Sequence, residues 1–277
     1  MNNIISSDYY RVRHGWTLRG TFIGVVLVII VVMGIILGVQ SAQFGTDTTD
    51  MTAAEIAEMQ QDAADAQEEM GSIDSGAAFG LQMLGQFLIP FFFLPVILAV
   101  FCADFSAGTY RNTLSFESNR TKVYFSKLLL SVGICLAMVL GMLGVSWLVG
   151  GIAFGFGGFS TAYFGKVFTV LLLQLPIYLS YIAVGHFLVA VTKKSSTTIA
   201  IFLIGYFAVA IVLQTVAESD ASREWMQLLD PTTSGQIMVS YEAMQIKDIL
   251  FVVLYNIGII GVTTLIGVTH YRKADMP

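Results

Sequence analysis

Six apolar runs of about twenty residues or more set the main constraint on how this chain folds. Such a run makes a helix about 30 Å long, enough to span the hydrocarbon core of a bilayer. With 56% hydrophobic and 12% charged residues, the chain also lacks the polar surface of a soluble domain. The sequence therefore predicts an all-α polytopic membrane protein, a single transmembrane domain over residues 1–277. The six predicted spans are 20–39, 81–103, 128–149, 167–191, 197–216 and 249–268.

Lys and Arg are distributed unevenly between the segments that join these runs. With the N-terminus inside, eleven lie in cytoplasmic segments and three outside, a clear positive-inside bias that predicts two cytoplasmic termini. The inner set is Arg11, Arg13, Arg19, Arg111, Arg120, Lys122, Lys127, Lys193, Lys194, Arg272 and Lys273, and the outer set is Lys166, Arg223 and Lys247.

The first nineteen residues interleave aromatic and basic side chains, among them Tyr9, Arg11, Arg13 and Trp16. This pattern is typical of a helix in the headgroup layer, with rings at the interface and cations on lipid phosphates. The sequence predicts an interfacial elbow helix over 1–19. An unstructured basic flank that only orients the first span is the alternative.

Two predicted external segments also have helical patterns. Residues 40–80 are rich in acidic residues and contain no basic one, with apolar residues spaced three and four apart. This favours an amphipathic helix, which either caps an exit path or is simply solvated and packed on its neighbours. Residues 217–248 contain two short helical stretches with Pro231 between them, which predicts an external helical hairpin between spans five and six.

The second span contains features of a candidate gate. Pro90 and Pro95 remove backbone donors and are expected to bend its helix, and Gln82 and Gln86 lie near its outer end. Both features are also common in ordinary membrane helices, so a structural role remains open.

Catalytic and ligand-binding motifs are not found in the sequence. The three His residues have no Cys, Asp or Glu at metal-ligand spacing, and Gly165-Lys166 lacks the remainder of a phosphate-binding loop. None of the six runs contains Asp, Glu, Lys or Arg, which disfavours coupling to an ion gradient. We therefore expect no enzymatic activity, metal site or cofactor in this chain, and no nucleic-acid partner.

The polar segment 104–127 separates spans two and three, and its pattern resembles that of the ABC-type export permeases. The pattern is an acidic residue, a Gly-Thr pair, an Arg-Asn pair, an Asn-Arg pair and Tyr-x-x-Lys before the next span. The matching residues are Asp104, Gly108, Thr109, Arg111, Asn112, Asn119, Arg120, Tyr124 and Lys127. In that family this loop is the coupling helix that docks on a separate ATPase, which implies docking by residues 109–115 here.

The resemblance extends to the predicted architecture. Six spans, an elbow and a helical hairpin are similar to the small permeases of bacitracin resistance, lantibiotic immunity and peptide export. Arg111 and Arg120 are expected to pair with acidic residues of the ATPase, and Tyr110 to fill an apolar pocket. The long acidic segment after span one departs from the pattern. The residues assigned to ATPase coupling are Asp104, Gly108, Thr109, Tyr110, Arg111, Asn112 and Arg120.

The resemblance implies the permease subunit of an ATP-driven ABC exporter in the bacterial plasma membrane. Its cargo would be amphipathic or hydrophobic: a peptide, an antibiotic such as an antimicrobial peptide, or a lipid-like molecule. Its expected partners are membrane lipid, a second permease copy or homologue, and cytoplasmic ABC ATPase subunits that bind ATP and Mg. Two alternatives stay open: an ATP-independent channel or facilitator, and a non-transport membrane scaffold or sensor.

Overall fold

The computed structural model describes residues 2–45, 75–106, 119–216 and 220–273, and within these ranges it is helical without strands. In chain order the α-helices are α1 (Asn2–His14), α2 (Trp16–Gly45), α4 (Gly76–Met83), α5 (Ile89–Ile97), α6 (Ala103–Ser106), α8 (Arg120–Phe154), α9 (Thr161–Thr192), α10 (Ser195–Val216), α11 (Asp220–Leu229), α12 (Ser234–Val239) and α13 (Ile246–Lys273). A π-helix, η2 (Leu98–Cys102), joins α5 to α6, and a 3₁₀ turn, η3 (Tyr241–Ala243), follows α12.

Five of these helices, α2, α8, α9, α10 and α13, are long and apolar enough to cross a membrane. Their outward faces carry large apolar side chains, such as Ile204, Leu254 and Leu265, each about two-thirds exposed. Water would disfavour so much exposed apolar surface, whereas lipid tails solvate it. The chain is therefore a multi-pass helical membrane protein.

The segment 81–103, predicted as one continuous helix, is interrupted in the structure. α4 ends at Met83, and a turn over 84–88 leads into α5. At this turn, Gly85 approaches the backbone of α12 so closely that a Cβ atom would lie 2.8 Å from the Gly235 carbonyl oxygen. Pro90 lies in the first turn of α5, where its missing N–H is not needed, and Pro95 lies inside α5 just before η2.

Several helices begin earlier than the sequence predicts. α8 starts at Arg120 and not at 128, because the Asn119 side chain caps it by accepting from the N–H groups of Thr121 and Lys122 at 3.1 and 3.3 Å. α9 starts at Thr161 and not at 167, capped by Ser160. As a result, residues 120–127, which we predicted to be loop, are helical, and Lys127 lies about two turns inside α8.

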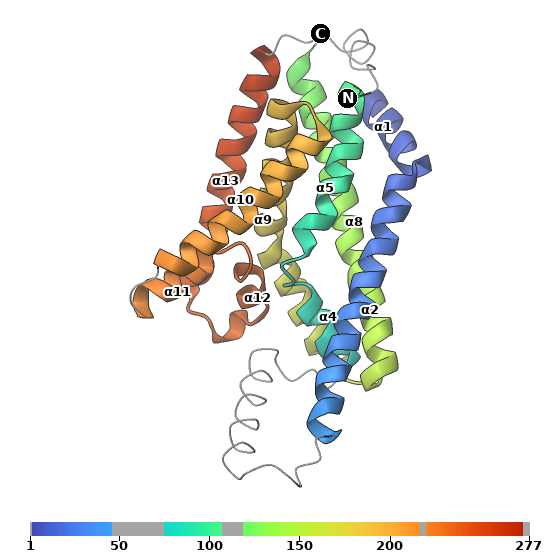
Figure 1. Ribbon diagram of the computed structural model, residues 1–277, viewed down its shortest axis with the longest axis vertical. Helices are drawn as coiled ribbons and strands as arrows, with labels where there is room; N and C mark the ends of the chain where they lie inside the picture. Colours follow the sequence, from blue (N-terminus) through green and yellow to red (C-terminus); the bar gives the residue numbers. More distant parts are fainter. Residues whose placement is uncertain (1, 46–74, 107–118, 217–219, 274–277) are drawn as a thin grey trace.

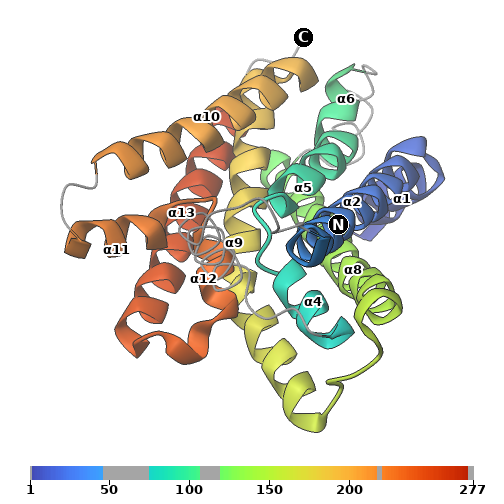
Figure 2. The same cartoon turned by 60° about the horizontal axis from the view of Figure 1, so that its bottom comes forward.

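The helices form one elongated bundle (Figure 1). The start of α1, the end of α6, the start of α8 and the end of α13 lie at one end, which we call the terminal end; α4, α12 and the end of α2 lie toward the other. Viewed from that second end, α1, α2 and α8 lie on one side and α10, α11 and α13 on the other, with α5 and α9 between them (Figure 2). α9 packs along α13, and α4 packs on α8.

Two predictions fall largely or wholly outside the described residues. The acidic stretch 40–80 lies mostly in 46–74, and the expected docking piece 109–115 lies in 107–118; both ranges are outside the described residues. Within 217–248 the structure has the short helices α11 and α12 on either side of Pro231.

Close packing of α4 on α8 generates a first prediction. A Cβ atom at Gly76 would lie 2.6 Å from the Gly151 backbone nitrogen and 2.8 Å from its Cα, so Gly76→Ala must push the helices apart. We expect a loss of about 1–3 kcal/mol of stability, measured as a lower Tm in detergent. The control is Gly144→Ala on α8, where a Cβ meets nothing within 4 Å. Equal Tm values for the two variants would show that this contact does not limit stability.

Candidate functional site

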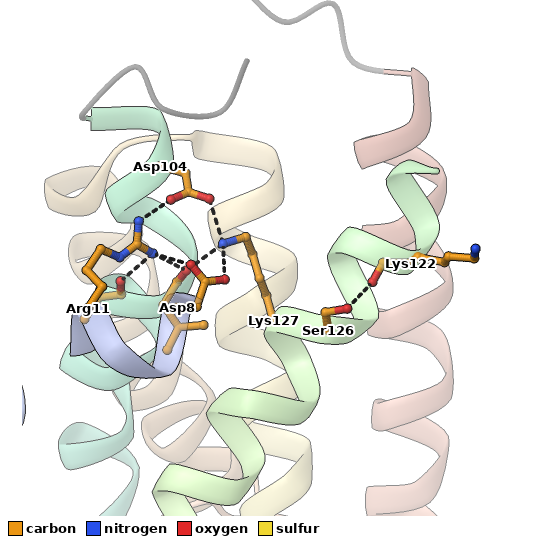
Figure 3. Close-up of polar contacts among 8 residues, drawn as sticks. Asp8, Arg11, Asp104, Lys122, Ser126 and Lys127 are labelled. Carbon is orange, nitrogen blue, oxygen red and sulfur yellow. Dashed lines mark hydrogen bonds and ion pairs between the residues drawn. The ribbon is translucent and has the colours of Figure 1, made fainter. Parts of the chain in front are cut away.

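Four charged side chains from three separate elements meet at the terminal end of the bundle (Figure 3). Asp8 and Arg11 come from α1, Asp104 from α6 and Lys127 from α8. We call these four residues the ion cluster. Asp104 and Lys127 lie on either side of segment 107–118, so the cluster joins α1 to both helices that flank that segment.

In the ion cluster each carboxylate contacts both cations. Lys127 Nζ lies 2.8 Å from Asp8 Oδ2 and 2.7 Å from Asp104 Oδ2. Arg11 Nη2 lies 3.0 Å from Asp8 Oδ1, and Arg11 Nη1 donates to Asp104 Oδ1. The four contacts form a closed ring with alternating charge (Figure 3).

The ring is also attached to the backbone of η2. Lys127 Nζ donates to the Val100 carbonyl oxygen at 3.1 Å, and Arg11 Nη2 donates to the same oxygen at 3.2 Å. A π-helix departs from the regular α-helical bonding pattern and recurs at functional sites. Here its carbonyl groups accept from the cations, and η2 becomes a third point of attachment for α1 and α8.

Burial makes charge balance within the cluster essential. The Lys127 side chain is fully buried, those of Asp104 and Asp8 are 3% and 10% exposed, and Arg11 is 38% exposed. Two cations and two carboxylates sum to zero, so no net charge is transferred out of water. The two cations that contact Asp104 favour its charged form over the neutral one.

Aromatic rings pack beside the cluster. Phe101 stacks on His186 with ring centres 5.1 Å apart and lies edge-on to Tyr124 at 5.5 Å, and Tyr271 of α13 contacts both Phe101 and Tyr124. All four are fully buried. His186 packs through its ring face, and neither of its ring nitrogens has a hydrogen-bond partner in the described residues.

The residues assigned to ATPase coupling fall into two groups. Asp104 lies in the ion cluster, and the Arg120 guanidinium donates to the Arg272 carbonyl oxygen at 3.0 Å, which joins the start of α8 to the end of α13. Gly108, Thr109, Tyr110, Arg111 and Asn112 lie outside the described residues. Of the other matching residues, Asn119 caps α8, and Tyr124 and Lys127 are fully buried in contacts with other helices.

The elbow and gate candidates lie apart from one another. Arg11 belongs to the ion cluster, whereas Arg13 and Trp16 are exposed, Trp16 by 75%. Toward the opposite end of the bundle, Gln82 and Gln86 line a cleft of about 570 Å³ together with Gln227 and Gln236 of the α11–α12 region. Pro90 and Pro95 follow the interrupted turn in the chain and belong to α5.

The ion cluster links three elements of the fold. The described residues contain no group of three or more His, Cys, Asp or Glu side chains that could hold a metal ion. Every charged group of the cluster is occupied by its neighbours, so the cluster's evident capacity is to fix α1, η2–α6 and α8 to one another.

Sequence reasoning missed the ion cluster itself. Lys127 belongs to the segment 104–127 that the sequence predicts as a cytoplasmic loop, and no role is predicted for Asp8. The available signal was that acids are scarce in the segments predicted to be cytoplasmic, and that Asp8 and Arg11, three residues apart, share one helix face. An acid within a mainly basic segment, such as Asp8 beside Arg11 and Arg13, is a candidate for an ion pair.

Comparison with known proteins yields one family. Residues 67–277, most of the chain, match the model of the family described as "Protein of unknown function (DUF2705)". No curated protein matches, and no solved structure matches.

Removing one charge from the ion cluster is expected to be costly. Lys127→Met leaves one carboxylate in excess in a buried site, and losing one partner of a buried ion pair typically costs about 3–5 kcal/mol. We expect a low folded yield and a reduced Tm in detergent. Asp104→Asn combined with Lys127→Met restores the charge balance and should recover part of the loss.

The matched control for that experiment is Lys122→Met on the same helix. The Lys122 side chain is exposed and points away from the cluster (Figure 3), so its Tm should stay near that of the wild type. If Lys127→Met and Lys122→Met were equally stable, the ion cluster would not contribute to the fold.

Proposed function

We propose a transport function for this chain, which belongs to the family described as "Protein of unknown function (DUF2705)": the permease subunit of an ATP-driven exporter. The observation that carries the proposal is the ion cluster. It attaches α1, η2–α6 and α8 to one another at both borders of segment 107–118. That segment holds the residues that resemble the docking loop of ABC-type export permeases.

The proposed topology has six crossings, with the α4–α6 segment as the second. The basic residues of α1 and α8, and Arg272 and Lys273 at the end of α13, lie at the terminal end. In line with the positive-inside rule, we propose that this end and both termini lie in the cytoplasm. α1 serves as the interfacial elbow, and α11 and α12 form the external hairpin. The membrane would be the bacterial plasma membrane.

In this proposal the ion cluster transmits movement of the ATPase to the membrane helices. A permease that binds no nucleotide must receive work through contact. Segment 107–118 starts directly after α6 and ends at the cap of α8, so displacement of this segment acts on both helices at once. Since buried ion pairs resist separation, α1, η2–α6 and α8 would move as one body.

The interrupted second span provides a hinge for that motion. The turn 84–88 lacks regular helical bonding, and Pro95 with the adjoining π-helix further weakens the α-helical pattern. Motion of the terminal end would therefore be absorbed at this turn, and hinges are commonly a few residues at the ends of elements. Gln82 and Gln86 flank the turn and line the cleft toward the opposite end, so a hinge movement would change the shape of that cleft.

The proposed assembly contains two membrane halves and two ATPases. The second half is a copy of this chain or a homologue, and ATP and Mg bind to the ATPase subunits. Arg111 and Tyr110 are proposed to contact the ATPase, with the cation on acidic residues and the ring in an apolar pocket. The cargo is proposed to be amphipathic or hydrophobic: a peptide, an antibiotic or a lipid-like molecule.

Co-purification tests the docking assignment. The wild-type chain, extracted from its native membrane, should co-elute with an ATPase, and Arg111→Ala/Asn112→Ala should lose that ATPase while remaining folded. Lys273→Ala is the control, because it removes one cation from the terminal end outside segment 107–118. The measurement is the ATPase activity and subunit composition of each eluate.

Two outcomes would count against the proposal in different ways. An ATPase that stays bound to Arg111→Ala/Asn112→Ala as strongly as to wild type would sink the docking assignment alone. A chain that purifies without any ATPase, from membranes that retain known peripheral ATPases, would overturn the exporter proposal and favour a channel or a scaffold.

This transmission of movement makes a separate prediction. Asp104→Asn/Lys127→Met keeps the charge balance but removes contacts between α1, α6 and α8, so the ATPase should still co-elute while export falls by tenfold or more, since every step of 1.4 kcal/mol is a factor of ten. The measurement is ATP-driven uptake of an amphipathic peptide into inverted vesicles, with Lys122→Met as the control. Normal export by the double variant would show that the ion cluster transmits no work.

A further inference from the structure

An apolar groove runs along the outside of the bundle between α1, α2 and α8. Its volume is about 860 Å³, within the range of small-molecule sites. Ile5 and Tyr9 of α1, Phe22 of α2 and Leu129, Ile134 and Met138 of α8 are among its lining residues. The groove extends from α1 along the first half of α8, with Val12 as part of its buried floor.

Two arginines are the charged residues of the groove lining. Arg13 and Arg19 are both exposed and have no hydrogen bond or ion pair with any described residue. They differ in this respect from Arg11, two residues from Arg13, whose charge is balanced by Asp8 and Asp104. The groove therefore combines a long apolar surface with two positive charges that no described residue balances.

We propose that this groove is a binding site for an anionic phospholipid, with an acyl chain along α8 and the headgroup phosphate on Arg13 and Arg19. Apolar surface takes a lipid tail, guanidinium groups pair with phosphate through parallel hydrogen bonds, and basic pockets between membrane helices bind anionic headgroups. The bound lipid would contact α1, α2 and α8 together. The site depends on membrane insertion of the bundle and not on the exporter proposal.

A second copy of the chain fits this surface less well. In a two-fold interface the same patch meets itself, so Arg13 and Arg19 would approach the same cations of the partner. The described acids at the terminal end, Asp8 and Asp104, are already paired in the ion cluster and are not available to neutralise them. A negatively charged lipid supplies the missing charge.

The groove floor offers a precise way to block the site. Gly133 of α8 lines the groove, and a Cβ atom there would have nothing within 4 Å, so a larger side chain would project into the groove without disturbing the packing. Gly144, on the same helix and outside the lining, also has nothing within 4 Å. Gly133→Phe and Gly144→Phe therefore make a matched pair.

The test is titration of the purified full chain with phosphatidylglycerol and with phosphatidylcholine, followed by native mass spectrometry and by Tm. The wild type should bind phosphatidylglycerol more tightly and gain Tm from it. Arg13→Gln/Arg19→Gln should weaken phosphatidylglycerol binding by roughly thirtyfold. It should weaken phosphatidylcholine binding much less, because the choline cation of that lipid already offsets the charge of its phosphate. Arg272→Gln/Lys273→Gln, which removes two cations from the same end on α13, should behave as wild type.

Groove filling separates the lipid from other occupants. Gly133→Phe should reduce binding of both lipids, and Gly144→Phe should not. Equal affinity of the wild type for the two lipids, or unchanged phosphatidylglycerol binding in Arg13→Gln/Arg19→Gln, would overturn the proposal. A change of oligomeric state in Gly133→Phe with normal lipid binding would overturn it in favour of an interface between two copies of the chain.

Discussion

Buried charge must be balanced, and this requirement organises the terminal end of the molecule. Lys127 is fully buried, and only the carboxylates of Asp8 and Asp104 make that position tolerable. Those carboxylates belong to α1 and α6, so both helices must lie within ion-pair distance of Lys127. Each of the three elements is placed by a charge carried on another, and the aromatic cluster of Phe101, Tyr124 and Tyr271 then packs beside the ring.

The second apolar run is helical next to the ion cluster and interrupted farther from it. At the terminal end, ionic contacts and buried rings fix the helices, whereas the segment 84–88 breaks the second apolar run where Gly85 meets the backbone at Gly235. In the exporter proposal this contrast separates the part that receives force from the part that yields to it. The cleft lined by Gln82 and Gln86 lies beside the yielding part.

The helical membrane class could be predicted from the sequence because the length of an apolar run is a local property of residue order and needs no tertiary contact. The runs at 128–149 and 167–191 lie inside α8 and α9, but the helices extend beyond them where Asn119 and Ser160 provide caps. The break at 84–88 could not be predicted, because it depends on contact with α12, which lies far along the chain. Pairing of Asp8 with Lys127 is non-local in the same way. The pattern of each segment taken separately does not show which segments meet.

The distance along the chain between the partners of the ion cluster bears on how the protein is made. Asp8 and Lys127 are 119 residues apart, and Arg11 and Asp104 are 93. During synthesis α1 emerges long before α6 and α8 exist, and its carboxylate must remain hydrated at the membrane surface until they arrive. α1 is thus translated well before the helices that it pairs with, so membrane insertion and final assembly are separate events for this protein.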